Sequence, residues 1–131
     1  MKLRSTVVLA AVAMIGLPAV AQAATVAGSR INYTTNGNIS ESGRYTGPGS
    51  GRLQLCADET GTRIGGGGSA DYIMRDISFA PDYYIRGLIV EPGPPATCTA
   101  YTSTNTGYYY YTQVNAQISS PTQSGWAEAR N

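Results

Sequence analysis

The sequence predicts an all-β protein: a small antiparallel sandwich or partly closed barrel of six or seven strands with one disulfide. Two observations lead to this prediction. Beyond the N-terminal leader, no segment keeps an apolar stripe at helical spacing, because glycine or proline interrupts almost every window. Short runs of β-branched and aromatic residues instead alternate with turn residues, at a spacing typical of sandwiches and barrels.

The N-terminus has the pattern of a secretory signal peptide. Lys2 and Arg4 form a positive region, Val7–Val20 is apolar, and an Ala-Gln-Ala cleavage motif follows. A membrane anchor is the alternative, but the apolar run is shorter than the ~20 residues that a span needs. We therefore expect residues 1–23 to be a bacterial signal peptide and residues 24–131 to be a single exported β domain, secreted or periplasmic.

Charge and composition exclude several functions. Nine basic residues, two of them in the leader, stand against eight acidic ones, so no basic patch for nucleic acid is expected. The chain has no histidine, and its one lysine lies in the leader. Triads and dyads that use histidine or a lysine base are therefore excluded. We expect a protein that is not an enzyme and that needs no cofactor or metal.

Cys56 and Cys98 are the two cysteines, and export would place them in an oxidising compartment. A disulfide between them closes a loop of about 43 residues and stabilises the fold by roughly 4 kcal/mol in the chain-entropy model. A metal site or a redox pair is the alternative, but C-x-x-C spacing and histidine are both missing. The disulfide is expected to connect two strands of different sheets.

The first half of the domain predicts three strands. Residues 29–35 alternate as a half-buried strand, and Asn36-Gly37 favours a type I′ hairpin that returns through residues 38–45 with Ile39 facing inward. Residues 52–58 alternate clearly, with Leu53 and Leu55 on one face and Cys56 on the other. A glycine-rich loop, residues 65–69, precedes the next strand.

The strand expected at the centre of the fold is residues 83–91, the densest β-prone run. Leu88, Ile89 and Val90 are consecutive apolar residues, which favours a strand covered on both faces. The preceding strand, residues 71–79, is expected to pair with it as an antiparallel hairpin. That preceding strand would place three apolar side chains on one face: Ile73, Ile77 and Phe79.

Two further strands are predicted, over residues 96–103 and 108–118, and the segment from Ser119 onward is expected to be a tail or a short edge element. Four consecutive tyrosines begin the longer strand. Period two sends Tyr108 and Tyr110 to the core and Tyr109 and Tyr111 to a polar face. Exposed tyrosines beside amides suit a surface that binds sugars or protein, although high β propensity alone also explains them.

Three acids close in sequence, Asp71, Asp76 and Asp82, raise the question of carboxylate catalysis. Asp71 and Asp82 are expected at turns, where aspartate is favoured by local hydrogen bonds. A catalytic role is therefore not assigned.

The function expected is that of an exported, non-catalytic domain that binds an extracellular or cell-surface ligand, a glycan or a protein. The residues expected to bind are Tyr109, Tyr111, Tyr84 and Trp126. One alternative is a self-assembling subunit of an extracellular fibre or coat, since the chain carries few charges to guard its strand edges. Another is an inhibitor of a secreted hydrolase that presents the stiff loop Glu91–Pro95.

Overall fold

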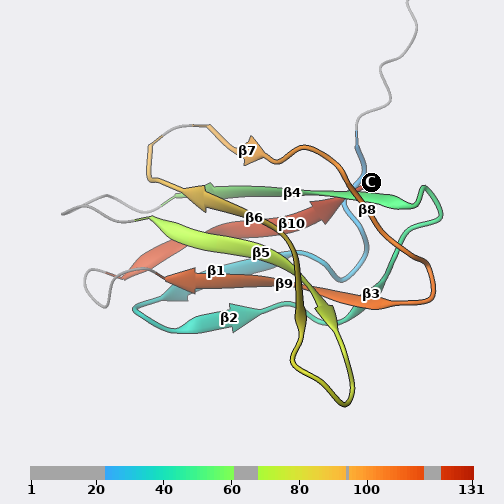
Figure 1. Ribbon diagram of the computed structural model, residues 1–131. Helices are drawn as coiled ribbons and strands as arrows, with labels where there is room; N and C mark the ends of the chain where they lie inside the picture. The colour runs from blue at the N-terminus through green and yellow to red at the C-terminus, as the bar shows by residue number, and fades with distance from the viewer. Residues whose placement is uncertain (1–22, 61–67, 94, 117–121) are drawn as a thin grey trace, which may run out of the picture.

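A computed structural model describes residues 23–60, 68–93, 95–116 and 122–131, and the strands in it form two antiparallel sheets packed as a sandwich (Figure 1). The first sheet has the order β1-β10-β4-β7, with β8 also pairing β4. Its strands are β1 (Ile31–Thr35), β10 (Gln123–Arg130), β4 (Arg52–Glu59), β7 (Thr97–Cys98) and β8 (Thr102–Ser103). The second sheet has the order β2-β9-β5-β6, with β3 also pairing β9. Its strands are β2 (Ile39–Glu41), β9 (Tyr109–Ala116), β5 (Ser69–Asp76), β6 (Tyr83–Val90) and β3 (Tyr45–Thr46).

The all-β prediction is confirmed, and the two packed sheets fit the sandwich. The described residues form ten strands rather than six or seven. Four of them have only two or three residues, because the expected strands 38–45 and 96–103 each divide into two short pieces. The leader up to residue 22 and most of the glycine-rich loop lie outside the described residues.

The core lies between the sheets and follows the predicted alternation. Leu53 and Leu55 of β4 are fully buried, and so is Val114 of β9. Each inward position alternates with an outward one, as period two requires. Tyr108 departs from the prediction: it precedes β9 and is exposed, whereas Tyr110 is buried and its ring centroid lies 6.4 Å from that of Tyr45.

The Asn36-Gly37 turn does not form the predicted hairpin. Gly37 has a φ of 67°, in the region that glycine adopts at little cost. The turn nevertheless carries the chain from β1 in one sheet to β2 in the other, where β1 pairs with β10 and β2 with β9. Ile39 is exposed rather than inward, because the register pairs it with Asn115, an outer-face position of β9. A turn motif fixes a local reversal but not which strands pair.

β6 was expected at the centre of the fold, and this prediction is wrong. Among the described strands, β6 pairs with β5 alone and forms one edge of its sheet, and β9 and β5 are the inner strands. Leu88 and Val90 pack toward the core, but Ile89 between them is exposed. Three consecutive apolar residues in β6 therefore do not mean that both faces of this strand are buried.

The expected C-terminal tail is instead β10, an inner strand between β1 and β4. After Gln123, its inward positions are small residues, Gly125, Ala127 and Ala129. A Cβ on Gly125 would lie 2.2 Å from the Asp58 carbonyl oxygen and 2.7 Å from Tyr33 Oη. The glycine at this position is thus required by tight packing, because a side chain there would meet the Asp58 carbonyl and the Tyr33 hydroxyl.

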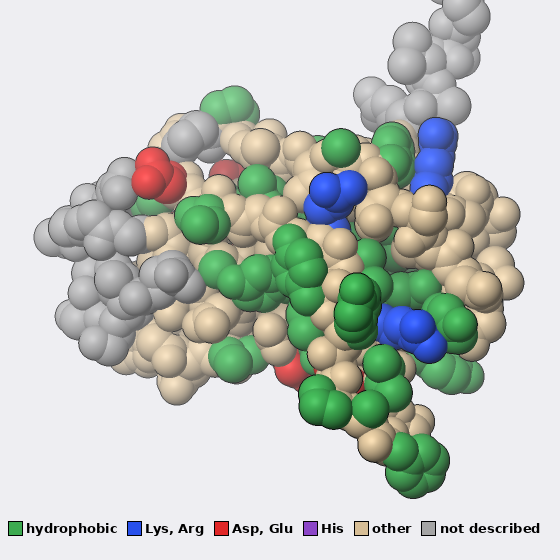
Figure 2. Space-filling view, viewed as in Figure 1, with side chains coloured by type: hydrophobic (Ala, Val, Ile, Leu, Met, Phe, Trp, Pro, Cys, Tyr) green, Lys and Arg blue, Asp and Glu red, His purple; other side chains and the backbone are tan. Residues whose placement is uncertain are grey.

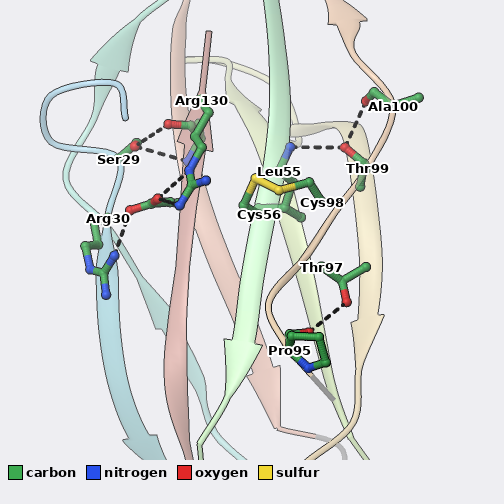
Figure 3. The surroundings of a disulfide bond; sticks show 12 residues. Ser29, Arg30, Leu55, Cys56, Pro95, Thr97, Cys98, Thr99, Ala100 and Arg130 are labelled. Carbon is green, nitrogen blue, oxygen red and sulfur yellow. Dashed lines mark hydrogen bonds and ion pairs between the residues drawn. A yellow bond between two sulfur atoms is a disulfide. The ribbon is translucent and has the colours of Figure 1, made fainter. Parts of the chain in front are cut away.

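The predicted disulfide between Cys56 and Cys98 is present, but it joins neighbouring strands of one sheet, β4 and β7 (Figure 3). The two cysteines are directly opposite each other in the register. Cys56 lies on the face opposite the buried leucines, as the alternation predicted. Thr99 extends the attachment, because its N–H donates to the Leu55 carbonyl at 2.8 Å and its Oγ1 accepts from the Leu55 N–H at 3.0 Å.

The first and last segments of the described chain lie side by side. The Val26 N–H donates to the Ala129 carbonyl at 2.8 Å, and the Asn131 N–H donates to the Ala24 carbonyl at 3.0 Å. In the part of the chain that the structure describes, no helix is long and apolar enough to cross a membrane.

Candidate functional site

The hairpin formed by β5 and β6 projects beyond the sandwich at the bottom of Figure 1. The two strands pair antiparallel as predicted, with a shift of register between Ile73 and Met74. Residues 77–82 form the turn. Phe79 was expected to share a buried strand face with Ile73, but it lies in this turn and is fully exposed.

Asp82 holds the base of the turn together. Its Oδ1 accepts a hydrogen bond from the Ile77 N–H at 3.0 Å, and its Oδ2 accepts one from Tyr111 Oη at 2.7 Å. The Ile77 N–H and then the Tyr111 hydroxyl favour the charged carboxylate, so the pKa of Asp82 is lowered. Asp82 therefore occupies the turn position expected for it and ties the turn to β9.

Tyr111 is on the predicted outer face but is not available to a ligand, because its exposed fraction is 3%. The Arg44 guanidinium lies 3.8 Å from its ring centroid and covers it. Arg44 also donates from Nε to Asp76 Oδ2 at 2.8 Å. Burial, then the hydrogen bond to Asp82, raise the pKa of Tyr111, so the neutral hydroxyl remains the donor. Tyr111 thus positions the hairpin instead of meeting a partner.

Exposed aromatic side chains gather around this hairpin. Tyr84 of β6 is 53% exposed, and Tyr109, opposite Asp76 in the register, is 59% exposed. Figure 2 shows hydrophobic side chains over β6 and at the tip of the projecting hairpin. We call this surface the aromatic hairpin surface, and its members are Phe79, Tyr83, Tyr84, Tyr108 and Tyr109.

Arginine side chains order parts of this surface. The Arg75 guanidinium lies 3.4 Å from the Tyr108 ring centroid. Tyr84 packs edge-on against Tyr72, with 5.8 Å between ring centroids. Stacking of this kind restricts rotamers before a partner arrives, so less conformational entropy is lost on binding.

The structure thus brings together two of the four predicted binding residues, Tyr84 and Tyr109. Tyr111 lies beneath the same surface. Trp126 lies on the outer face of the other sheet, where the Arg30 guanidinium is 4.5 Å from its ring. Trp126 is separated from the tyrosines by the whole sandwich, because β10 belongs to the opposite sheet.

Sequence reasoning missed Phe79, Tyr83 and Tyr108 as surface residues. Phe79 carried a usable signal, since it lies two residues before Pro81 in a stretch bounded by Ser78 and Ala80. A proline so close after an aromatic residue favours a turn over a strand continuation. Tyr83 and Tyr108 are exposed at the place where the hairpin of β5 and β6 extends beyond the sandwich, and period two cannot predict where a sheet ends.

Within the described ranges, no group of three or more histidine, cysteine, aspartate or glutamate side chains is placed to hold a metal ion. Comparisons of the chain with protein-family models, with curated proteins and with solved structures found no match.

Proposed function

We propose that this chain is an exported, non-catalytic binding domain that engages a protein partner through the aromatic hairpin surface. The observation that carries the proposal is Phe79, a fully exposed phenylalanine at the tip of a projecting hairpin. Exposing a large apolar side chain to water is unfavourable, and further exposed tyrosines lie on this hairpin and at the start of the neighbouring strand β9.

A protein fits this surface better than a glycan. Tyrosine, phenylalanine and arginine are enriched in protein interfaces, and a few buried anchors carry most of the binding energy. A projecting tip suits a groove on a partner, whereas small-molecule sites are concave. The hydrogen bonds of Asp82 and Tyr111 hold the tip in one conformation, which lowers the entropic cost of docking. A secreted hydrolase with a cleft is one partner of this kind.

Truncation of the tip tests the proposal. Phe79→Ala and Tyr84→Ala are expected to weaken binding by roughly 1–3 kcal/mol each, about fivefold to a hundredfold, while the melting temperature stays unchanged. Ile39→Ala is the matched control, because Ile39 is exposed on the same sheet but pairs with Asn115 at the far end of β9. Affinity is measured for envelope or extracellular proteins captured by the wild-type chain.

Two results would contradict the proposal. One is a set of captured proteins that bind both hairpin variants as tightly as the wild type. The other is a glycan array in which specific sugars bind and depend on Tyr109 but not on Phe79, which would assign the surface to glycans instead.

Self-assembly remains the second candidate, and one observation favours it. β6 is an edge strand with exposed Tyr83, Tyr84 and Ile89, and the described part of β6 pairs with β5 alone. Such an edge can accept a strand from another copy.

A further inference from the structure

One end of the core is polar instead of apolar. Inward positions of four strands meet there, and each side chain is at least nine-tenths buried. We call this group the polar end of the core; its members are Tyr33, Glu59, Ser69, Asp71 and Gln123. Tyr33 Oη lies 3.0 Å from Ser69 Oγ, and Gln123 Nε2 donates to the Gly68 carbonyl at 3.1 Å. The group lies between the two sheets, away from the aromatic hairpin surface.

Asp71 is the exception within this group. It was expected at a turn, but it lies within β5 and has no exposed surface. The Ser69 hydroxyl favours the charged form of Asp71, but the hydrogen bond that this hydroxyl makes is with Tyr33 Oη. Among the described residues, neither carboxylate oxygen of Asp71 has a hydrogen-bond partner. A buried ionised carboxylate without a partner is very unfavourable, and such a group takes up a proton instead.

Within the described ranges, the charge that acts on Asp71 from the elements packed against it is negative. Glu59 faces it from β4 and Tyr33 faces it from β1. Its register neighbours, Leu88 on β6 and Val114 on β9, are uncharged. Burial first, and then the Glu59 charge, raise the pKa of Asp71 to about 7.

The arginine nearest in register on a neighbouring strand is directed elsewhere. Arg86 of β6 pairs with Ile73, two residues along β5, and its guanidinium donates to the Tyr101 carbonyl at 3.2 Å. The inward residues of β10, Gln123 and Gly125, are uncharged. Among the described residues, a proton is therefore the simplest group that neutralises Asp71.

We propose that Asp71 is a buried proton-binding site that couples the packing of the two sheets to pH. The folded chain holds the proton and the unfolded chain, with an ordinary carboxyl pKa near 3.8, releases it. The contribution of Asp71 to stability is complete below pH ~4 and is lost as the pH rises toward 7. Each pH unit in this window changes the folding constant about tenfold.

The test compares wild type, Asp71→Asn and Asp76→Asn by urea unfolding from pH 4 to pH 9. Asparagine keeps the shape of a protonated aspartate but does not titrate. The ratio of the folding constant of Asp71→Asn to that of wild type is therefore expected to be at least tenfold higher at pH 8 than at pH 5. Asp76→Asn is the control: Asp76 lies on the same strand, partly exposed, and pairs with Arg44, so its variant should keep the wild-type slope over pH 5–8. Parallel curves for wild type and Asp71→Asn, so that the ratio of their folding constants is the same at pH 5 and pH 8, would overturn the proposal.

Infrared difference spectroscopy of the wild type gives a second readout that does not depend on a variant. A buried protonated carboxyl band is expected at pH 5.5 and should disappear with a midpoint near pH 7. Absence of that band in the folded chain at pH 5.5 would also overturn the proposal, and this holds even if Asp71→Asn fails to fold.

Discussion

Glu128 is a second buried acid in this molecule, and its surroundings have the opposite effect. Its Oε2 accepts from Arg30 at 2.8 Å and its Oε1 accepts from Arg130 Nε at 2.6 Å (Figure 3). Burial opposes its charge, but the hydrogen bonds from Arg130, Arg30 and Thr25 outweigh burial, and the pKa of Glu128 is lowered. Two buried carboxyl groups thus differ according to their partners: arginines favour the charged form of Glu128, whereas the surroundings of Asp71 favour its protonated form.

We expect Glu128→Gln to lower the free energy of unfolding by about 1–3 kcal/mol at pH 7, because two arginines lose a charged partner whose own side chain is buried. Because the pKa of Glu128 is lower in the folded chain than in the unfolded chain, its charge stabilises the fold at pH values above the unfolded pKa. This stabilisation is lost as the pH falls below about 4.5. Urea unfolding at pH 7 and pH 3 measures both effects. A difference between the variant and wild type that persists at pH 3 would argue against the ionic origin.

The control for this prediction is Glu41→Gln. Glu41 pairs with Arg44 at 3.3 Å on the surface, where both side chains are more than a third exposed. Exposed pairs contribute little, so this change should remain within about 0.5 kcal/mol.

Among the elements, β7 depends most on a covalent bond. It has two residues, and its register with β4 covers two pairs, Cys56 with Cys98 and Ala57 with Thr97. A strand this short forms few hydrogen bonds with its neighbour. The disulfide and the two hydrogen bonds of Thr99 therefore hold the segment that connects β6 to β9 against β4.

Reduction, or Cys56→Ser with Cys98→Ser, is expected to lower stability by about 2–5 kcal/mol. The reason is that reduction returns conformational entropy to the unfolded chain, which the disulfide restricts by joining residues 42 positions apart in sequence. Hydrogen exchange should rise first in β7 and β8, while β9 and β5 stay protected. Two free thiols in the unfolded, unreduced chain, or an unchanged melting temperature after reduction, would show that this bond does not form.

For the whole molecule, the choice is between binding a partner and assembling with itself. The binding proposal predicts a monomer in sedimentation velocity, even at high concentration, because β6 is bounded by Pro81 and Pro92, which limits strand addition. Oligomers that disappear in Ile89→Lys, where Ile89 is exposed on β6, would favour the fibre subunit instead. Persistent oligomers in that variant would assign self-association to another surface.

The amino-acid sequence by itself determined most of the longer strands, with β10 as the exception, and the face that many of their residues present. Alternation in Leu53–Leu55 and in Tyr110–Val114 predicted the buried positions correctly, because a strand turns successive side chains to opposite faces whatever its neighbours are. The disulfide followed from there being two cysteines. The projecting surface was found in part, through Tyr84 and Tyr109.

Only the tertiary structure decided which strands pair and where the sheets end. The Asn36-Gly37 turn bridges two sheets, β6 lies at an edge, and β10 lies inside despite its small residues. Strand pairing depends on contacts between residues far apart in sequence, and local propensity contains little information about them. For the same reason Tyr111 is covered by Arg44, which is 67 positions earlier, and Asp71 meets Glu59 only when the two sheets pack together.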